Sequence, residues 1–207
     1  MNNRVSSFQY DEIFSGLPGY FDRNALALFR SQYERNDLYG QFARSLHKTP
    51  DDIAGLEQIP FLPISFFKTH SVRTGLFVPE IIFESSGTTG QTASRHDVKS
   101  VSLYRESFTR GFELFYGPVS DYCIIGLLPA YLERSGSSLV FMVDELIRQS
   151  KHPQSGFYLY AFDKLHELLI DLEKKRQKAL LIGVSFALLD FAGEFPMHLR
   201  STIMMET

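Results

Sequence analysis

Residues 85–90 form a run of small and hydroxylated residues whose types and spacing suit the binding of an anion such as phosphate. Glycine allows positive φ and close backbone approach, so amides beside two glycines can converge on an anion. Neighbouring hydroxyls can donate to phosphate oxygens or bind a hydrated Mg²⁺. We therefore expect residues 85–90 to bind phosphate, with Thr88 and Thr89 acting in catalysis. The members of this loop are Ser85, Ser86, Gly87, Thr88, Thr89 and Gly90.

The residues around the loop indicate that it follows a strand. An apolar stretch at 76–83 leads into it, and ligand-binding loops in α/β proteins follow the carboxyl ends of strands. A solvated turn has a similar composition and stays open as an alternative. A Walker-type loop is excluded, because it needs a lysine directly after the second glycine, where this chain has Gln91.

The sequence Ser-Ser-Gly-Thr-Thr-Gly after an apolar strand resembles the phosphate-loop signature of the acyl-adenylate-forming superfamily. The wider sequence is most similar to the LuxE-type acyl-protein synthetases, and the similarity covers nearly the whole chain. The stretches that carry it are FESSGTTGQTASRHDV at 83–98, LLPAYLERSGSSLVFMVDELI at 127–147, LIGVSFALLDFAG at 181–193 and IMMET at 203–207.

This resemblance implies a two-step reaction. A carboxylic acid, by resemblance a fatty acid, attacks ATP to give acyl-AMP, and a thiol acceptor, a protein cysteine or coenzyme A, then takes the acyl group. Residues 85–90 would hold the phosphates with Mg²⁺, and Arg95 would supply a charge that many members place on a lysine. Glu206 would touch the metal and Thr207 the adenylate phosphate, although this pair can equally just end a strand.

The resemblance also implies that the chain corresponds to the N-terminal part of such an enzyme. A glycine-rich segment would follow Glu206 and Thr207, and the ribose-binding aspartate and the small C-terminal domain would come later still. We therefore expect this chain alone to be inactive, and a nucleotide-binding fragment without turnover is the main alternative function.

A second group of candidates lies between an expected strand and an expected helix. Gly183, Val184, Ser185 and Phe186 would line the acyl or adenine pocket. The same residues partly match the nucleophile elbow of serine hydrolases. That less favoured alternative would use Ser185 as the nucleophile, with Asp190 or Glu194 as the acid and His198 as the base.

Arg134 lies in another polar, glycine-containing stretch, which precedes an expected helix. A guanidinium group binds carboxylate or phosphate with two parallel hydrogen bonds, so Arg134 is a candidate for substrate binding. The stretch also suits helix capping by Ser137 or Ser138, and that interpretation is slightly favoured.

Composition excludes several classes of function. A net charge of -3 and an isoelectric point near 6.1 leave no basic stripe for nucleic acid. The first ten residues are polar, unlike a signal peptide. No apolar run of the sequence approaches the roughly 18 residues of a membrane span. We therefore expect a cytoplasmic protein. The histidines lack zinc-site spacing, and the single cysteine, Cys123, lies in an apolar run that indicates a core residue, not an acyl acceptor.

The elements that position these residues follow from hydrophobic periodicity. Residues 1–75 are expected to form a helical N-terminal region, and residues 76–207 an α/β nucleotide-binding region, incomplete at its C-terminus, with a mostly parallel sheet flanked by helices. The loop and the chain end should then meet beyond the strand ends. Expected strands are 80–84, 122–128, 157–160, 179–183 and 202–206; expected helices are 100–115, 137–149, 162–176 and 185–194.

Overall fold

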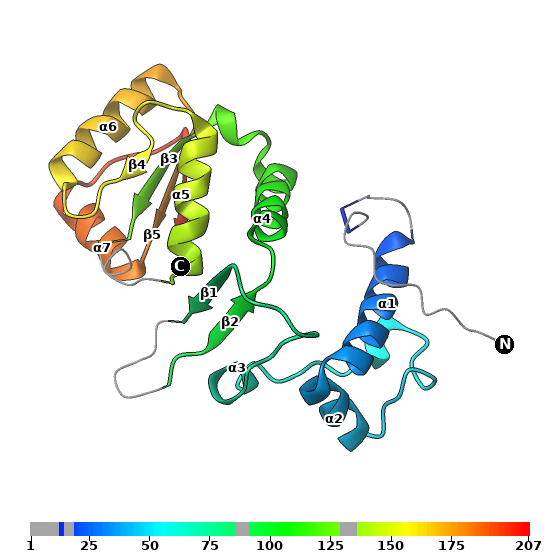
Figure 1. Cartoon of the computed structure of the whole chain (residues 1–207). Coiled ribbons are helices and arrows are strands. Elements are labelled where there is room, and N and C mark those ends of the chain that lie inside the picture. The colour runs from blue at the N-terminus through cyan, green and yellow to red at the C-terminus, as the bar shows by residue number, and fades with distance from the viewer. Residues whose placement is uncertain (1–12, 15–18, 86–91, 129–135) are drawn as a thin grey trace. The chain divides into compact units, whose positions relative to one another are not determined.

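The computed structural model describes residues 13–14, 19–85, 92–128 and 136–207 (Figure 1). By its internal contacts the chain divides into two compact units, Met1–Pro79 with Gly87–Asp97, and Glu80–Ser86 with Val98–Thr207. The domain boundary that we expected near residue 75 stays a prediction, because these contacts do not test which parts fold independently.

The first unit is built from helices around a small core. Asn36 separates the two longer helices, since it ends one and its Oδ1 caps the next by accepting from the amide of Tyr39 at 3.1 Å. Phe29, Tyr39 and Ile53 form the buried centre. The helices are α1 (Tyr20–Arg35), α2 (Asp37–Ser45) and α3 (Phe66–Thr69), with a 3₁₀ turn at Leu56–Gln58.

The second unit contains a four-stranded parallel sheet flanked by helices, which confirms the expected α/β class. Its strands match the apolar runs closely, although β4 is shorter than expected. The sheet strands are β3 (Cys123–Leu127), β4 (Gly156–Phe157), β5 (Ala179–Gly183) and β6 (Thr202–Glu206). The helices are α4 (Val101–Tyr116), α5 (Ser138–Ser150), α6 (Phe162–Lys175) and α7 (Ser185–Glu194), with a 3₁₀ turn at Val119–Asp121.

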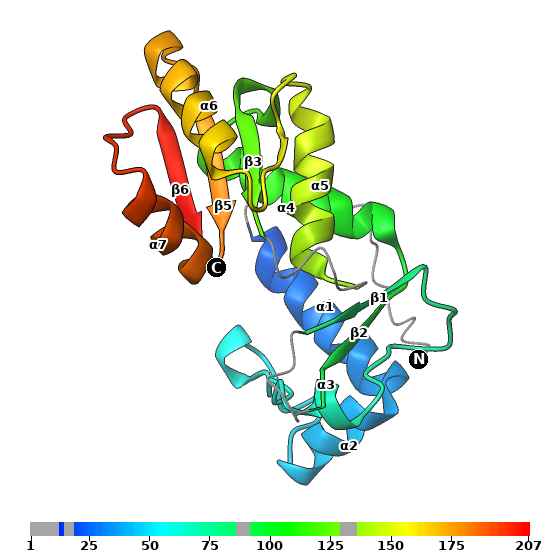
Figure 2. The same cartoon turned by 90° about the vertical axis from the view of Figure 1, so that its left-hand side faces the viewer.

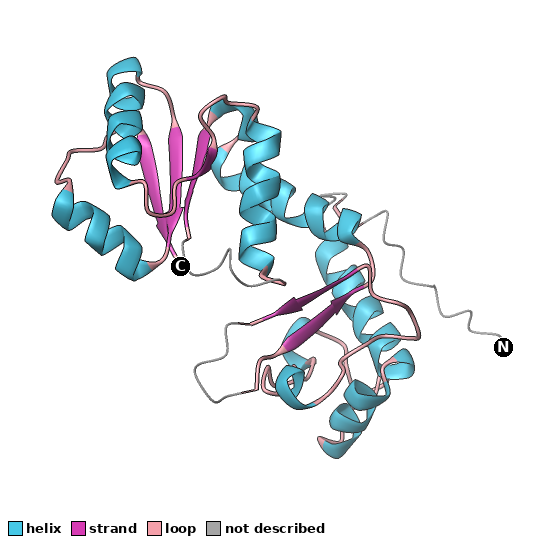
Figure 3. Cartoon of the chain, turned by 60° about the vertical axis from the view of Figure 1, so that its left-hand side comes forward, coloured by secondary structure: helices cyan, strands magenta, loops and turns pink. Residues whose placement is uncertain are grey.

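The strand order β4-β3-β5-β6 places a reversal of direction in the middle of the sheet. The chain moves from β3 outward to β4, then crosses back past β3 to β5 and continues to β6. Helices α4 and α5 lie on one face, and α6 and α7 on the other (Figures 2 and 3). Such a fold binds ligands outside the carboxyl ends of the strands at the point of reversal, which here lies between β3 and β5.

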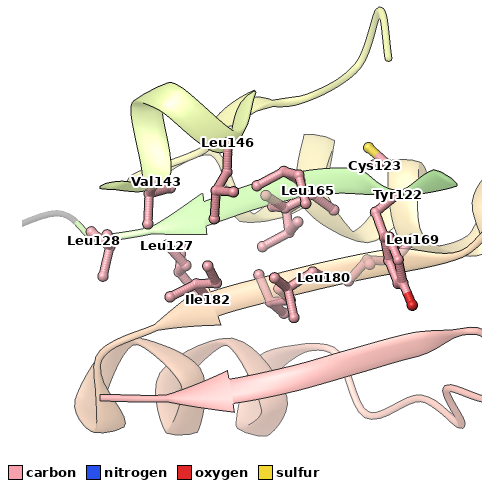
Figure 4. Packing of buried hydrophobic residues seen from close by; sticks show 14 of the residues in the cluster. Tyr122, Cys123, Leu127, Leu128, Val143, Leu146, Leu165, Leu169, Leu180 and Ile182 are labelled. Atoms are coloured by element: carbon pink, nitrogen blue, oxygen red, sulfur yellow. The ribbon is translucent and has the colours of Figure 1, made fainter. Parts of the chain in front are cut away.

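The core of this unit forms on the two central strands. Every residue of β3 and β5 is buried, as expected for parallel strands covered on both faces. Leucine, isoleucine and valine side chains from the strands and helices interdigitate there (Figure 4). Gly126 leaves room for the Phe157 ring of β4 and for α5, because a Cβ at this position would lie 2.5 Å from that ring and 3.2 Å from Val143.

One expectation about the sheet is wrong. The strand expected at 80–84 forms as β1 (Ile81–Glu84), but it pairs with β2 (Arg95–Val98) in a separate two-stranded sheet and does not join the parallel sheet. Only Phe83 is buried in β1, so this strand lacks the continuous burial of a central parallel strand. The short connection to β2 also makes local pairing less costly than a long crossover.

The edge strand β6 is held by a carboxylate on α6. Glu173 accepts hydrogen bonds from the amides of Arg200 and Ser201 at 3.0 Å and from the hydroxyl of Thr202 at 3.0 Å. Burial pushes the pKa of Glu173 upward, but these hydrogen bonds outweigh it and leave the pKa below its ordinary value of 4.5. Glu173 therefore fixes the start of the strand that ends at Glu206.

We expect Glu173→Gln to destabilise the protein above pH 4.5 and to have little effect in stronger acid. A carboxyl group whose pKa is lower in the folded state stabilises that state above its unfolded pKa, and this contribution is lost as the pH falls through the folded pKa. The loss at pH 7 should be about 1 kcal/mol, because the group is close to solvent and screened. Urea unfolding of both proteins from pH 3 to 8 measures it; a constant difference across this range would contradict the assignment.

Candidate active site at the carboxyl edge of the sheet

The carboxyl ends of three parallel strands bring candidate residues from distant parts of the sequence together. The register places Leu127 beside Gly183, and Gly183 beside Glu206. Two backbone hydrogen bonds continue this alignment past the strands: the amide of Val184 donates to Leu127 O at 3.3 Å, and the amide of Thr207 donates to Gly183 O at 3.1 Å. The ends of β3, β5 and β6 therefore form one edge, at the point where the strand order reverses.

Ser185 and Glu206 are in direct contact at this edge. The hydroxyl of Ser185 donates to Oε1 of Glu206, and both residues are exposed. Ser185 is the first residue of α7, and the preceding residue, Val184, provides no side-chain cap. A carboxylate at a helix N-terminus interacts favourably with the helix dipole, so Glu206 stabilises the start of α7. Glu206 is also exposed, so its carboxylate is accessible to a cation.

The residues around Ser185, which are Gly183, Val184 and Phe186, differ in how far they are buried. The side chain of Val184 belongs to the buried core, whereas 53% of Phe186 is exposed. Gly183 allows α7 to begin close to the sheet, because a Cβ there would lie 2.7 Å from Cγ of Leu188 and 3.3 Å from Cβ of Leu127. Of these four residues, only Ser185 and Phe186 have side chains that are exposed to solvent.

The segment that the sequence predicts to bind phosphate follows β1, and the end of β1 lies beside the N-terminus of α5. The amide of Glu84, the last residue of β1, donates to Gly136 O at 2.9 Å. Gly136 has φ of 91°, a conformation that favours glycine, and Ser137 then caps α5 by accepting from the amide of Val140 at 3.3 Å. Because α5 starts after the carboxyl end of β3, Ser85 lies on the side of the sheet where Ser185 and Glu206 meet.

Several candidates lie outside the described residues, so the structure gives them no position. They are the rest of the loop, Ser86, Gly87, Thr88, Thr89 and Gly90, together with Arg134. The capping interpretation of the neighbouring stretch is confirmed for Ser137. Sequence reasoning missed Gly136 as a residue that connects β1 to α5, and its only signal was a glycine directly before a serine cap.

Glu206 is the carboxylate of the candidate pair that could bind a metal at this edge. No group of three or more His, Cys, Asp or Glu that could hold an ion occurs in the parts of the chain that the structure describes. Mg²⁺ usually keeps several waters and binds through one or two carboxylates and the phosphates of a substrate. Glu206 fits that limited role, in which the remaining ligands come from the nucleotide and water.

Cys123 lies at the opposite end of β3, away from the candidate edge. Its thiol is fully buried, and burial raises its pKa to about 11, an effect that a hydrogen bond from Ser155 at 3.9 Å opposes only weakly. A neutral buried thiol is a poor nucleophile. Its position agrees with the expectation that Cys123 is a core residue.

The contact between Ser185 and Glu206 also bears on the hydrolase alternative. A serine nucleophile in a catalytic triad donates its hydroxyl proton to an imidazole. Here the partner of the Ser185 hydroxyl is a carboxylate. This arrangement suits a pair of polar groups at a ligand site better than an activated nucleophile.

No family model, curated protein or solved structure matches this chain. The resemblance to LuxE-type enzymes therefore rests on the quoted residues alone. None of the helices in the described ranges is both long enough and apolar enough to pass through a membrane.

We expect Gly183→Ala to destabilise the protein by about 1–3 kcal/mol, because the new methyl group would force Leu188 and the start of α7 away from the sheet. Gly193→Ala is the matched control. Gly193 lies near the end of α7, and nothing lies within 4 Å of an added Cβ there, so the same substitution should stabilise the protein by about 1 kcal/mol. Thermal unfolding of the two variants should shift in opposite directions; equal shifts would show that the contact at Gly183 is unimportant.

We expect the native protein to react very slowly with iodoacetamide. Raising the thiol pKa from 9.0 to about 11 lowers the thiolate fraction at pH 8 roughly a hundredfold, and burial slows the reaction further. Labelling can be followed by intact mass in buffer and in 6 M guanidinium, where the rate should rise at least a hundredfold. Similar rates in the two solvents would place Cys123 at the surface.

Proposed function

We propose that the protein activates a carboxylic acid, most simply a fatty acid, as an acyl-AMP and then passes the acyl group to a thiol. In the first step a carboxylate oxygen attacks the α-phosphorus of ATP, the bond to the bridging oxygen breaks, and pyrophosphate leaves. In the second step a thiolate attacks the acyl carbon and AMP leaves. The thiol belongs to a protein cysteine or to coenzyme A, and we place the reaction in the cytoplasm.

The observation that carries this proposal is the contact between Ser185 and Glu206 at the carboxyl edge of the parallel sheet. The end of β1, which leads into the loop expected to bind phosphate, is bonded to Gly136 just before α5. Parallel α/β sheets bind nucleotides at this edge, at the point where the strand order reverses. The resemblance of residues 85–90 to an adenylate-forming loop has the same implication from the sequence alone.

Each group has a role that its chemistry supports. The loop hydroxyls of Thr88 and Thr89 and the neighbouring amides would hold the phosphates, since transfer at phosphorus depends mainly on positioning and charge stabilisation. The carboxylate of Glu206 is available to a Mg²⁺ that neutralises the phosphates of ATP. Phe186, half-exposed beside this pair, offers an apolar surface to the adenine or the acyl chain.

Hydroxylamine trapping tests the proposal directly. The full-length protein that contains this chain, incubated with ATP, Mg²⁺ and a series of fatty acids from eight to sixteen carbons, should yield acyl hydroxamate and support exchange of labelled pyrophosphate into ATP. Thr88→Val combined with Thr89→Val should reduce both signals at least a hundredfold, an effect of the size seen when transition-state donors are removed. Thr69→Val, an exposed threonine on α3, is the control and should retain full activity.

A nucleotide-binding protein without turnover is the alternative, and the same preparation distinguishes it. Calorimetric titration with ATP and Mg²⁺ would then show binding that depends on Thr88 and Thr89, while no hydroxamate forms with any acid. Absence of both binding and hydroxamate would exclude the adenylate-forming and the nucleotide-binding proposals together.

A further inference from the structure

The first unit contains a pocket of about 320 Å³ that is sunk into its small core. Its walls come from α1, the start of α2 and residues 56–72. Phe29 and Tyr39, two of the three buried residues at the centre of this unit, form part of the wall. The hydroxyl of Tyr39 donates to Pro60 O at 2.7 Å and so joins the helices to the opposite wall.

The pocket has the lining and size of a small-molecule site. Such sites are mostly apolar, contain a few placed polar groups and have volumes from about 300 Å³ upward. Two aromatic side chains of the lining are strongly exposed, Phe21 at 76% and Phe61 at 82%. A cavity of about 150 Å³ takes benzene, so this pocket has room for roughly twelve carbon atoms.

The polar groups of the lining are uncharged. Among the described residues that line the pocket there is no aspartate, glutamate, lysine, arginine or histidine, and amides are contributed by Gln32 and Asn36. Asn36 is only 5% exposed. Its Oδ1 is already bound to the amide of Tyr39, which leaves its NH₂ group as the donor that it can offer to a molecule in the pocket.

We propose that this pocket binds an uncharged apolar molecule with one oxygen that accepts a hydrogen bond from Asn36, such as a ketone or ester with an alkyl chain of about ten carbons. A free carboxylate is disfavoured, because no cation lines the pocket and a buried unpaired charge is costly. The pocket lies wholly within the first unit, so this proposal does not depend on the function proposed for the sheet edge.

Displacement of a fluorescent probe tests for the site. N-phenyl-1-naphthylamine, which is neutral and apolar, should bind the whole chain saturably with one site per molecule and brighten. 2-Dodecanone should displace it, whereas dodecanoate at pH 8 should do so at least tenfold less well. Absence of a saturable signal, or equal competition by ketone and carboxylate, would overturn the proposal.

A filling substitution locates the site on α1. Ala25 lines the pocket, so Ala25→Phe should weaken 2-dodecanone binding at least tenfold by occupying its volume. The same substitution at Ala27, on the same helix but not among the lining residues, should leave the affinity within about twofold. Equal effects of the two substitutions would place the bound ketone elsewhere.

Asn36→Asp tests the role of the amide without removing the helix cap, because aspartate caps helices as well as asparagine does. The variant keeps an oxygen for the amide of Tyr39 but loses the NH₂ donor. Binding of 2-dodecanone, which can only accept, should fall about tenfold, the value of one hydrogen bond of ordinary strength. Binding of 1-dodecanol, which can donate to the carboxylate, should fall less than threefold. Equal losses for the two ligands would mean that Asn36 acts only through the fold, and the proposed contact would be wrong.

Discussion

Complete burial of β3 and β5 is the constraint on which the second unit depends. Ten residues in these two strands are buried, and a strand buried on both faces requires a layer of helices on each side. Two glycines of these strands leave room for their neighbours. Gly126 makes room for the Phe157 ring of β4 and for Val143 of α5, and Gly183 makes room for Leu188 of α7. The same packing therefore fixes both the core and the position at which α7 starts.

The candidate site follows from this packing. Because α7 begins directly after β5, Ser185 is held at the end of the central strand, and the register of β6 places Glu206 next to it. Neither residue needs a loop of its own to be positioned. Glu173 contributes from the far end of β6, where three hydrogen bonds fix the point at which the strand begins.

Most of the second unit could be predicted from the sequence, because continuous apolar runs and helical periodicity are strong signals. The runs that became β3, β5 and β6 and the helices between them lie within a few residues of their expected places. The error at β1 has a physical cause: a short apolar run does not show whether it will join a sheet with distant strands or with a neighbour. Strand β2 gave no signal, since Arg95, His96 and Asp97 are polar and only Val98 is buried.

The candidate site could be predicted in its residues but not in its contacts. A glycine and serine between an expected strand and helix indicated Gly183 and Ser185, and a glutamate at the end of an apolar run indicated Glu206. The hydrogen bond between Ser185 and Glu206 depends on which strands are neighbours. Hydrophobic periodicity along the chain does not predict the strand order β4-β3-β5-β6. The pocket of the first unit was missed for a similar reason, because its lining comes from three separate segments of α1, α2 and residues 56–72.

The two edge strands of the parallel sheet differ in length. On one side β4 contributes only two residues, too few to accept another strand in register. On the other side β6 has five residues, and half of the Met204 side chain is exposed. Within the described residues this strand pairs only with β5. An open border of this length is a template for strand addition, which makes β6 the place where the sheet would grow or where concentrated protein would self-associate.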